Sequence, residues 1–188
     1  MPGLTQYTIT DAPEPSKPLL EKVQKSLGFI PNLYATFAES AAVLGGYLAL
    51  SASLDKGALS ASERQVVEIA VSTENRCTYC VAAHSTIAEM VRARPEIVTA
   101  VRTGALTGDP RIDALVAFTR AVVANKGFVP DTAVAAFLGA GYSKAQLLEV
   151  VGHVGLKVIA NYVHALAKFP VDEAFQQQRW DASQLKVA

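Results

Sequence analysis

Apolar side chains recur every three to four positions through most of the chain, and they nowhere alternate with polar ones over the length of a strand. A repeat near 3.6 residues is typical of helices with one buried face, whereas alternation is typical of half-buried strands. Prolines, serines and glycines interrupt the pattern where helices commonly begin and end. The sequence therefore predicts an all-α fold.

The same start and stop signals divide the chain. Three prolines restrict the backbone of residues 1–17, which we expect to form an extended arm, and residues 18–188 are expected to form one domain. A hydrophobic fraction of 51% is enough for the core of such a domain. The predicted helices cover about 18–27, 31–39, 41–56, 61–72, 76–92, 95–103, 110–126, 130–138, 145–168 and 171–180.

Two capping boxes mark helix starts within this series. In each box, a serine caps the helix and a side chain three residues later reaches back to the serine's backbone amide. The pairs are Ser60 with Glu63 and Ser143 with Gln146, and a shift of 83 residues superimposes them, which is a faint sign of an internal repeat. Single side chains are expected to cap three further helices: Ser16, Ser40 and Asn75.

The only two cysteines in the chain lie three residues apart, at Cys77 and Cys80, and His84 follows four residues later. On a helix these three side chains fall within about 60° of one another. A helix N-terminus favours a thiolate, and an imidazole one turn away can deprotonate a thiol. The pattern predicts a redox site in which His84 activates Cys80 for attack and Cys77 is the more exposed sulfur, with the opposite assignment of the sulfurs left open.

Three other interpretations of the cysteine pair are weaker. Both sulfurs at disulfide-motif spacing, with a histidine on the same face, make simple apolar packing the minority explanation. A structural zinc site needs four ligands, and no fourth ligand lies nearby, so we expect no metal and no cofactor. A static disulfide is rare in a cytosolic chain and gives His84 no role.

Net charge and the lack of targeting signals limit the expected partners and location of the protein. Seventeen basic and seventeen acidic residues balance, so neither nucleic acid nor an anionic membrane surface is expected as a partner. The first residues lack the basic and apolar runs of a secretory signal, and no apolar stretch was expected to approach the roughly 20 residues of a membrane span. We therefore expect a cytoplasmic protein.

The residues around the cysteines resemble a known family. The segment 59–84, with its core S-T-E-N-R-C-T-Y-C-V-A-A-H, is similar to the carboxymuconolactone decarboxylase superfamily, specifically its alkylhydroperoxidase D-like (AhpD-like), peroxidase-related branch. Segments 29–34, 141–143 and 161–164 also resemble it, so the likeness extends from about 19 to 175. It implies an all-α fold of helical hairpins with its motif core at about 59–93, and homo-oligomers from dimers to hexamers.

The resemblance also implies roles for single residues. Cys77 and Cys80 match the redox pair of a peroxidase or disulfide reductase, and His84 matches the histidine of its proton relay. The relay glutamate would fall twelve residues before Cys77, where this chain has Gln65, which cannot ionise. Glu68 or Glu63 could replace it, although a capping box also explains Glu63 and a solvated surface also explains Glu68.

The sequence thus leads to a thiol-dependent hydroperoxidase or disulfide oxidoreductase, an antioxidant enzyme. Its expected partners are a hydroperoxide and an external dithiol or thioredoxin-like reductant. Two alternatives stay open: a decarboxylase-type lyase of the same superfamily that uses no thiols, and a non-enzymatic redox sensor or oligomeric binding protein.

Overall fold

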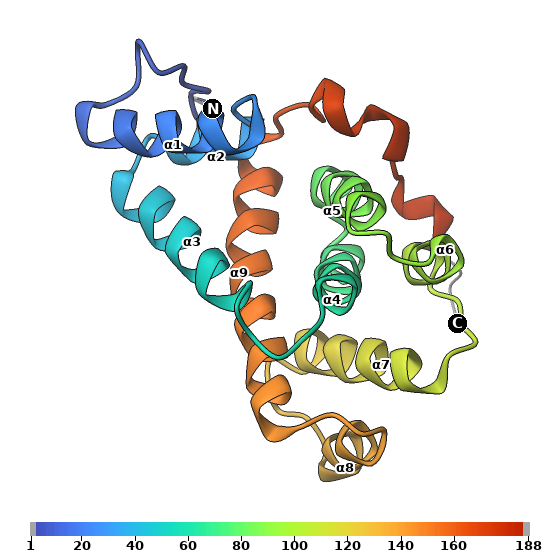
Figure 1. Cartoon of the computed structure of the whole chain (residues 1–188). Helices are drawn as coiled ribbons and strands as arrows, with labels where there is room; N and C mark the ends of the chain where they lie inside the picture. Colours follow the sequence, from blue (N-terminus) through green and yellow to red (C-terminus); the bar gives the residue numbers. More distant parts are fainter. Residues whose placement is uncertain (1–2, 186–188) are drawn as a thin grey trace.

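The computed structural model describes residues 3–185, which form nine α-helices and three short 3₁₀ segments and contain no strand (Figure 1). The prediction of an all-α fold is therefore confirmed. The helices are α1 (Lys17–Leu27), α2 (Asn32–Phe37), α3 (Ala41–Leu54), α4 (Ala61–Glu74), α5 (Thr78–Met90), α6 (Pro95–Thr103), α7 (Pro110–Ala124), α8 (Asp131–Gly139) and α9 (Lys144–Ala167). The 3₁₀ segments are Glu14–Ser16, Glu173–Gln178 and Ala182–Gln184, the second of them in place of the helix expected at 171–180.

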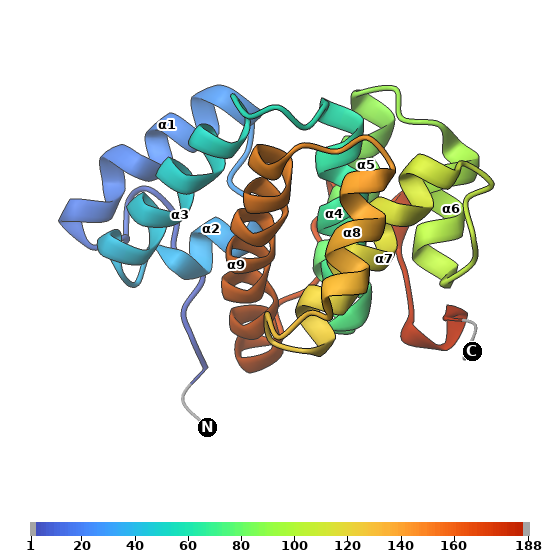
Figure 2. The same cartoon turned by 90° about the horizontal axis from the view of Figure 1, so that it is seen from below.

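Helix α4 lies in the middle of the fold. It packs against α5, α6, α7 and α9, and every residue from Gln65 to Thr73 is buried. Four of these nine residues are polar, namely Gln65, Glu68, Ser72 and Thr73, so α4 presents both apolar and polar side chains to its neighbours. Helix α9 runs between α1–α3 on one side and α4–α7 on the other, as both cartoon views show (Figures 1 and 2).

The buried apolar side chains form two clusters. One joins α4, α6, α7 and α8, and includes Ile69, Leu115 and Phe137. The other joins α2, α3, α5 and α9, and it contains both cysteines. The cysteine pair is therefore built into the interior of the bundle rather than placed on its surface.

Most of the predicted caps are present. Both capping boxes form with both of their hydrogen bonds, and the Ser40 side chain accepts from the Val43 amide. The expected cap at Ser16 is wrong, because its hydroxyl is buried and donates to the Ala38 carbonyl at 2.7 Å. That bond ties the start of α1 to the end of α2.

The expected cap at Asn75 is also wrong. Asn75 ends α4, and its side-chain amide donates to Asn161 Oδ1 on α9 at 2.9 Å. The residue that caps α5 is Cys77, two positions later. The reason is Arg76, whose left-handed backbone (φ 52°) turns the chain and delays the start of α5.

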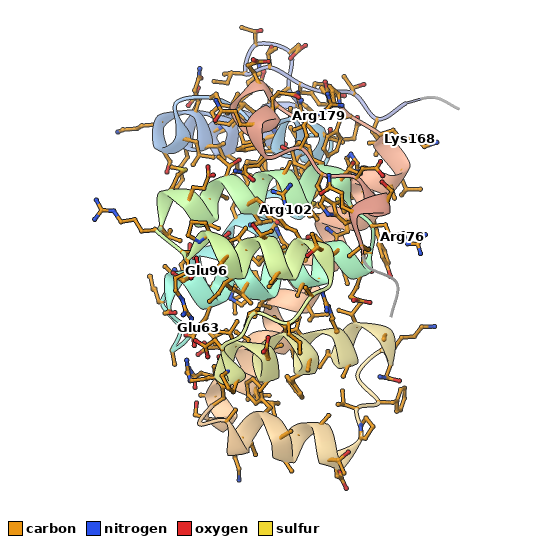
Figure 3. All side chains as sticks on the ribbon, turned by 90° about the vertical axis from the view of Figure 1, so that its right-hand side faces the viewer. Glu63, Arg76, Glu96, Arg102, Lys168 and Arg179 are labelled. Carbon is orange, nitrogen blue, oxygen red and sulfur yellow. The ribbon has the colours of Figure 1, made fainter. Side chains whose placement is uncertain are left out.

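The two ends of the described chain lie against the helices. Before α1 the chain is not extended throughout, because Glu14–Ser16 forms a 3₁₀ turn, and the Tyr7 amide donates to the Ala35 carbonyl at 3.1 Å. Near the other end, the Trp180 indole donates to the Arg102 carbonyl at 2.9 Å, and the Arg102 side chain donates to Gln178 and to the Arg179 carbonyl. Arg102 and Arg179 are labelled in Figure 3. These contacts fasten the C-terminal segment across α6.

Helix α9 corrects the expectation that no apolar stretch is long enough for a membrane span. By length and composition alone, its 24 residues are apolar enough to cross a membrane. Its buried face, however, carries three polar side chains, His153, Lys157 and Asn161, and packs on α3, α4 and α7. Only 33% of its most apolar stretch is buried, so α9 presents apolar side chains to the core and also on its exposed face.

The loop between α3 and α4 is held to α9 by Glu149. Its carboxylate accepts from the Ala58 and Leu59 amides at 2.8 and 2.9 Å.

We predict that Glu149→Ala lowers the free energy of unfolding by about 1.5–3 kcal/mol, since both bonds go to a charged acceptor. Urea unfolding would measure this, with the exposed Glu21→Ala as control, and an equal effect of the two substitutions would contradict it.

Candidate redox site

The two cysteines sit at the N-terminus of α5. Cys77 is the cap residue, with extended backbone (φ −84°, ψ 96°), and its Sγ accepts from the Cys80 amide at 3.3 Å. Both thiols are free. The preceding turn at Arg76, labelled in Figure 3, lets the chain leave α4 and enter α5 with the two sulfurs one turn apart. A disulfide can form between residues at this spacing without unwinding the rest of the helix.

Both sulfurs are shielded from solvent, since Cys77 is 3% exposed and Cys80 is 1% exposed. Only Cys80 lines a cavity of about 120 Å³ between α2, α3, α4, α5 and α9. The expectation that Cys77 is the more accessible sulfur is therefore not supported, because burial is nearly equal and the cavity reaches Cys80 instead. The cavity also gives a small molecule a place beside Cys80.

His84 lies in the same cavity, but both of its ring nitrogens have other partners. Its Nδ1 lies 2.7 Å from Glu68 Oε2 and 2.9 Å from Gln65 Oε1. Its Nε2 lies 2.6 Å from Lys157 Nζ. The expected direct hydrogen bond between His84 and Cys80 is absent from this arrangement of the described residues.

Glu68 is buried on α4 and joins two histidines. Its Oε2 contacts His84, and its Oε1 lies 2.9 Å from Nδ1 of His153. The solvated position considered for Glu68 is therefore wrong, because α4 is covered on this side by α5 and α9. Burial raises the pKa of Glu68, but the interactions with His84 and then with Lys157 outweigh it and hold the pKa well below its usual range.

The other candidate carboxylate, Glu63, is not brought to His84. It stays in its capping box, where its Oε2 accepts from the Ser60 amide at 2.9 Å, and it pairs with Arg111. Partial burial raises the pKa of Glu63, but these bonds hold it below its ordinary value. Figure 3 shows Glu63 near the edge of the molecule. Of the two carboxylates, only Glu68 is in place to act with His84.

Sequence reasoning missed the contribution of α9. His153, Lys157 and Asn161 follow one another at intervals of four residues on its buried face, and Lys157 also lines the cavity. Gln65 was noted only as a missing glutamate, yet it holds His84 through its amide oxygen. The available signal was three polar residues at helical spacing on the apolar side of a helix, since such residues are rarely buried without a partner.

These surroundings affect the two thiols in opposite ways. Burial raises the pKa of Cys80, but a hydrogen bond with Cys77 and then the charge of Lys157 outweigh it, with a further contribution from Asn161. The pKa of Cys80 is therefore below its ordinary value. The hydrogen bond with Cys80 and then burial raise the pKa of Cys77. Cys80 is thus the thiol that ionises first.

His84 is neutral in this setting. Burial lowers its pKa, and this outweighs the opposite effect of Glu68. A neutral ring that donates from Nδ1 to Glu68 leaves Nε2 free to accept from the Lys157 ammonium. Among the described residues, no group of three His, Cys, Asp or Glu side chains is arranged to hold a metal ion.

The rest of the cavity wall is mostly aromatic and aliphatic. It includes Leu33, Tyr34, Tyr47, Leu156 and Phe175. Burial raises the pKa of the Tyr34 and Tyr47 phenols, so both are neutral groups able to donate a hydrogen bond. Lys157 Nζ lies 5.5 Å from the centre of the Tyr47 ring. The cavity therefore suits a small molecule with an apolar part and one polar end.

Stability should depend on the ionised form of Glu68. We predict that Glu68→Gln lowers the free energy of unfolding at pH 7 by about 3–5 kcal/mol, because Lys157 loses its buried counter-charge. The pKa of Glu68 is depressed by folding, so its contribution is fully present above the ordinary value of about 4.3 and is lost as pH falls below it.

Chemical denaturation at pH 7 and pH 3.5 would check this, and the difference between wild type and Glu68→Gln should shrink at the lower pH. Glu74→Gln is a matched control on the same helix, because Glu74 is exposed and its ion pair with Arg120 is worth about 1 kcal/mol or less. A difference that stays constant with pH would contradict the role given to the Glu68 charge.

Comparison with known proteins identifies a similar family and a shared fold. Residues 39–121 match the carboxymuconolactone decarboxylase family. The alkylhydroperoxidase AhpD core structure of an uncharacterized peroxidase-related protein from Ralstonia eutropha JMP134 has a TM-score of 0.80 and 24% identity, over 95% of this chain and 98% of that one. A peroxidase-related protein from Silicibacter sp. TM1040 has a TM-score of 0.80 and 19% identity, over 94% and 95%.

A third similar structure is that of the debrominase Bmp8, whose C82A variant was solved in complex with 2,3,4-tribromopyrrole. It has a TM-score of 0.77 and 18% identity, over 93% of this chain and 94% of that one. No protein of curated function matches the sequence. The family match over residues 39–121 and the shared fold lead to one conclusion: this segment is similar to the carboxymuconolactone decarboxylase family, and the chain has an alkylhydroperoxidase D-like fold.

Proposed function

We propose that this protein is a thiol-dependent peroxidase that reduces small hydroperoxides through Cys80 and Cys77. The observation that carries the proposal is the position of Cys80. Its sulfur lines a small cavity, has Cys77 one helical turn away, and faces a buried group of charged and hydrogen-bonding side chains. Two thiols at this separation can pass from the reduced to the disulfide form and back.

The reaction has two steps. The Cys80 thiolate attacks the terminal oxygen of the hydroperoxide, the O–O bond breaks, and the products are a Cys80 sulfenic acid and an alcohol. The Cys77 thiol then attacks the Cys80 sulfur, which forms the disulfide and releases water. An external dithiol reduces the disulfide and is itself oxidised. The pKa difference between the thiols supports Cys80 as the attacking sulfur.

The family match over residues 39–121 and the shared fold support a peroxidase-related activity or a related lyase activity. A lyase would use the general acids and bases of the cavity and would not need the cysteines. The free thiols beside the cavity favour the peroxidase. Activity on a lactone acid that survives replacement of both cysteines by serine would favour the lyase instead.

Reductive dehalogenation is a second candidate. The fold is shared with the debrominase Bmp8, and the wall beside Cys80 is aromatic and aliphatic, which suits an aromatic halide. Release of bromide from 2,3,4-tribromopyrrole in the presence of a dithiol would test it. Bromide release without any hydroperoxide consumption would make this the main activity.

The proposal also includes partners. The cavity volume of about 120 Å³ limits the bound part of the peroxide to a few heavy atoms. A dithiol or thioredoxin-like protein would return the electrons. Exposed apolar side chains on α9, among them Leu148, Tyr162 and Leu166, support self-association of the chain, and the cytoplasm remains its expected location.

We predict that the reduced protein consumes a small hydroperoxide when a dithiol is supplied, and that Cys80→Ser and Cys77→Ser each lower the steady-state rate at least about 100-fold. Hydroperoxide loss and free thiols would be followed together. Thr78→Ala is the matched control, because Thr78 lies between the two cysteines at the start of α5 and is not part of the reaction.

The variants also distinguish the two sulfurs. In single turnover, Cys77→Ser should still consume one equivalent of hydroperoxide and stop at the sulfenic acid, whereas Cys80→Ser should consume none. The reverse result would exchange the roles of the sulfurs. Turnover by the double variant at the wild-type rate would overturn the proposed function. Reversible disulfide formation without turnover would identify a redox sensor.

A further inference from the structure

Lys157 is the feature of this site that a cysteine–histidine scheme does not use. It is 2% exposed, in the middle of an apolar helix, and it lines the same cavity as Cys80. Its one side-chain hydrogen bond among the described residues goes to His84. An ammonium has three protons, so two of them are free to face the cavity. A lysine this deeply buried is rare unless its ammonium has a partner.

The contacts of His84 make it a poor proton acceptor for Cys80. Its Nδ1 is occupied by Glu68 and Gln65, and its Nε2 is occupied by Lys157. Nε2 can exchange a proton with Lys157, and His84 makes no hydrogen bond with Cys80 among the described residues. The same contacts suit a different task, since a ring fixed at both nitrogens holds the lysine head in one place.

The charges around Cys80 leave Lys157 as the nearby cation. Glu68 is contributed by α4, Cys77 and His84 by α5, Lys157 by α9, and the phenols of Tyr34, Tyr47 and Tyr79 by α2, α3 and α5. The carboxylate of Asp55, which follows α3, also lines the cavity, but it pairs with Arg64 at 3.3 Å. Glu68 is the second carboxylate, and His84 is neutral. Glu68 and Lys157 contact opposite nitrogens of the His84 ring, and both line the cavity beside Cys80.

We propose that Lys157, rather than His84, takes the proton of Cys80 and delivers it to the leaving alkoxide, while Glu68 and His84 position Lys157. This role of Lys157 rests on the proposed peroxidase function. In the resting state the proton has moved from the Cys80 thiol to the Lys157 amine, giving thiolate and ammonium. When the thiolate breaks the O–O bond, the ammonium protonates the alkoxide and becomes the amine.

The proton balance closes over one cycle. In the second step the Cys77 proton leaves with the hydroxide of the sulfenic acid as water. The external dithiol then restores two thiols, and the Cys80 proton returns to the Lys157 amine. The net reaction converts a hydroperoxide and a dithiol into an alcohol, water and a disulfide, without net gain or loss of protons.

Two substitutions separate the positive charge of Lys157 from its ability to transfer a proton. Lys157→Met removes the charge, so the Cys80 thiolate loses its cation. Lys157→Arg keeps a charge but cannot release a proton at neutral pH. The thiolate would be measured through the rate of alkylation by iodoacetamide between pH 5 and 10, in a Cys77→Ser background so that Cys80 is the only thiol.

We expect the midpoint of that pH profile to rise by at least about 1 pH unit in Lys157→Met and to stay near the wild-type value in Lys157→Arg. Peroxide turnover is measured with both cysteines present. It should fall about 100-fold or more in both variants, since both lose the proton transfer by Lys157. Lys144→Met is the control, because Lys144 is exposed at the start of the same helix and should change neither quantity.

An unchanged midpoint in folded Lys157→Met, or wild-type turnover by Lys157→Arg, would overturn the proposal. Because Lys157→Arg keeps the charge, it tests proton delivery even if Lys157→Met does not fold. The two proposals can fail separately. If the wild type consumes no hydroperoxide, the proposed function fails, and the alkylation profiles still decide whether Lys157 controls the Cys80 thiol.

Discussion

A carboxylate and an ammonium buried in an apolar helical bundle are the interaction on which this site depends. Either charge alone would be strongly unfavourable there. Glu68 and Lys157 are both buried, and the His84 ring joins them through Nδ1 and Nε2. Because the ring is fixed at both ends, the positions of α4, α5 and α9 relative to one another are linked to the chemistry of one side chain.

The cysteine pair lies beside this buried group of charged side chains. Cys77 caps α5 and leaves Cys80 facing the cavity, where the hydrogen bond with Cys77 and then the charge of Lys157 favour its thiolate. A thiol in an apolar pocket would otherwise be harder to ionise and less reactive. The polar cluster thus explains why a buried sulfur can be a nucleophile. Gln65, in the place where the family resemblance implies a glutamate, contributes a hydrogen bond instead of a charge.

Much of this could be predicted from the sequence, because the signals were local. Helix periodicity and capping boxes gave the all-α fold and most helix starts, and the spacing of Cys77, Cys80 and His84 marked the site. Asn75 was misassigned because the left-handed turn at Arg76 has no clear sequence signal. Lys157 was missed because its contact with His84 spans 73 residues. Periodicity shows which face of α9 is polar, but not which helix that face meets.

The most direct test of the account is the mass of the reduced protein after one equivalent of a small hydroperoxide, followed by peptide mapping without reduction. We expect the whole chain to lose two hydrogen atoms and a single intrachain disulfide bond to join Cys77 to Cys80. A stable sulfinic acid on Cys80 with Cys77 still free would contradict it. So would an unchanged mass, because the cavity would then not direct peroxides to the sulfur.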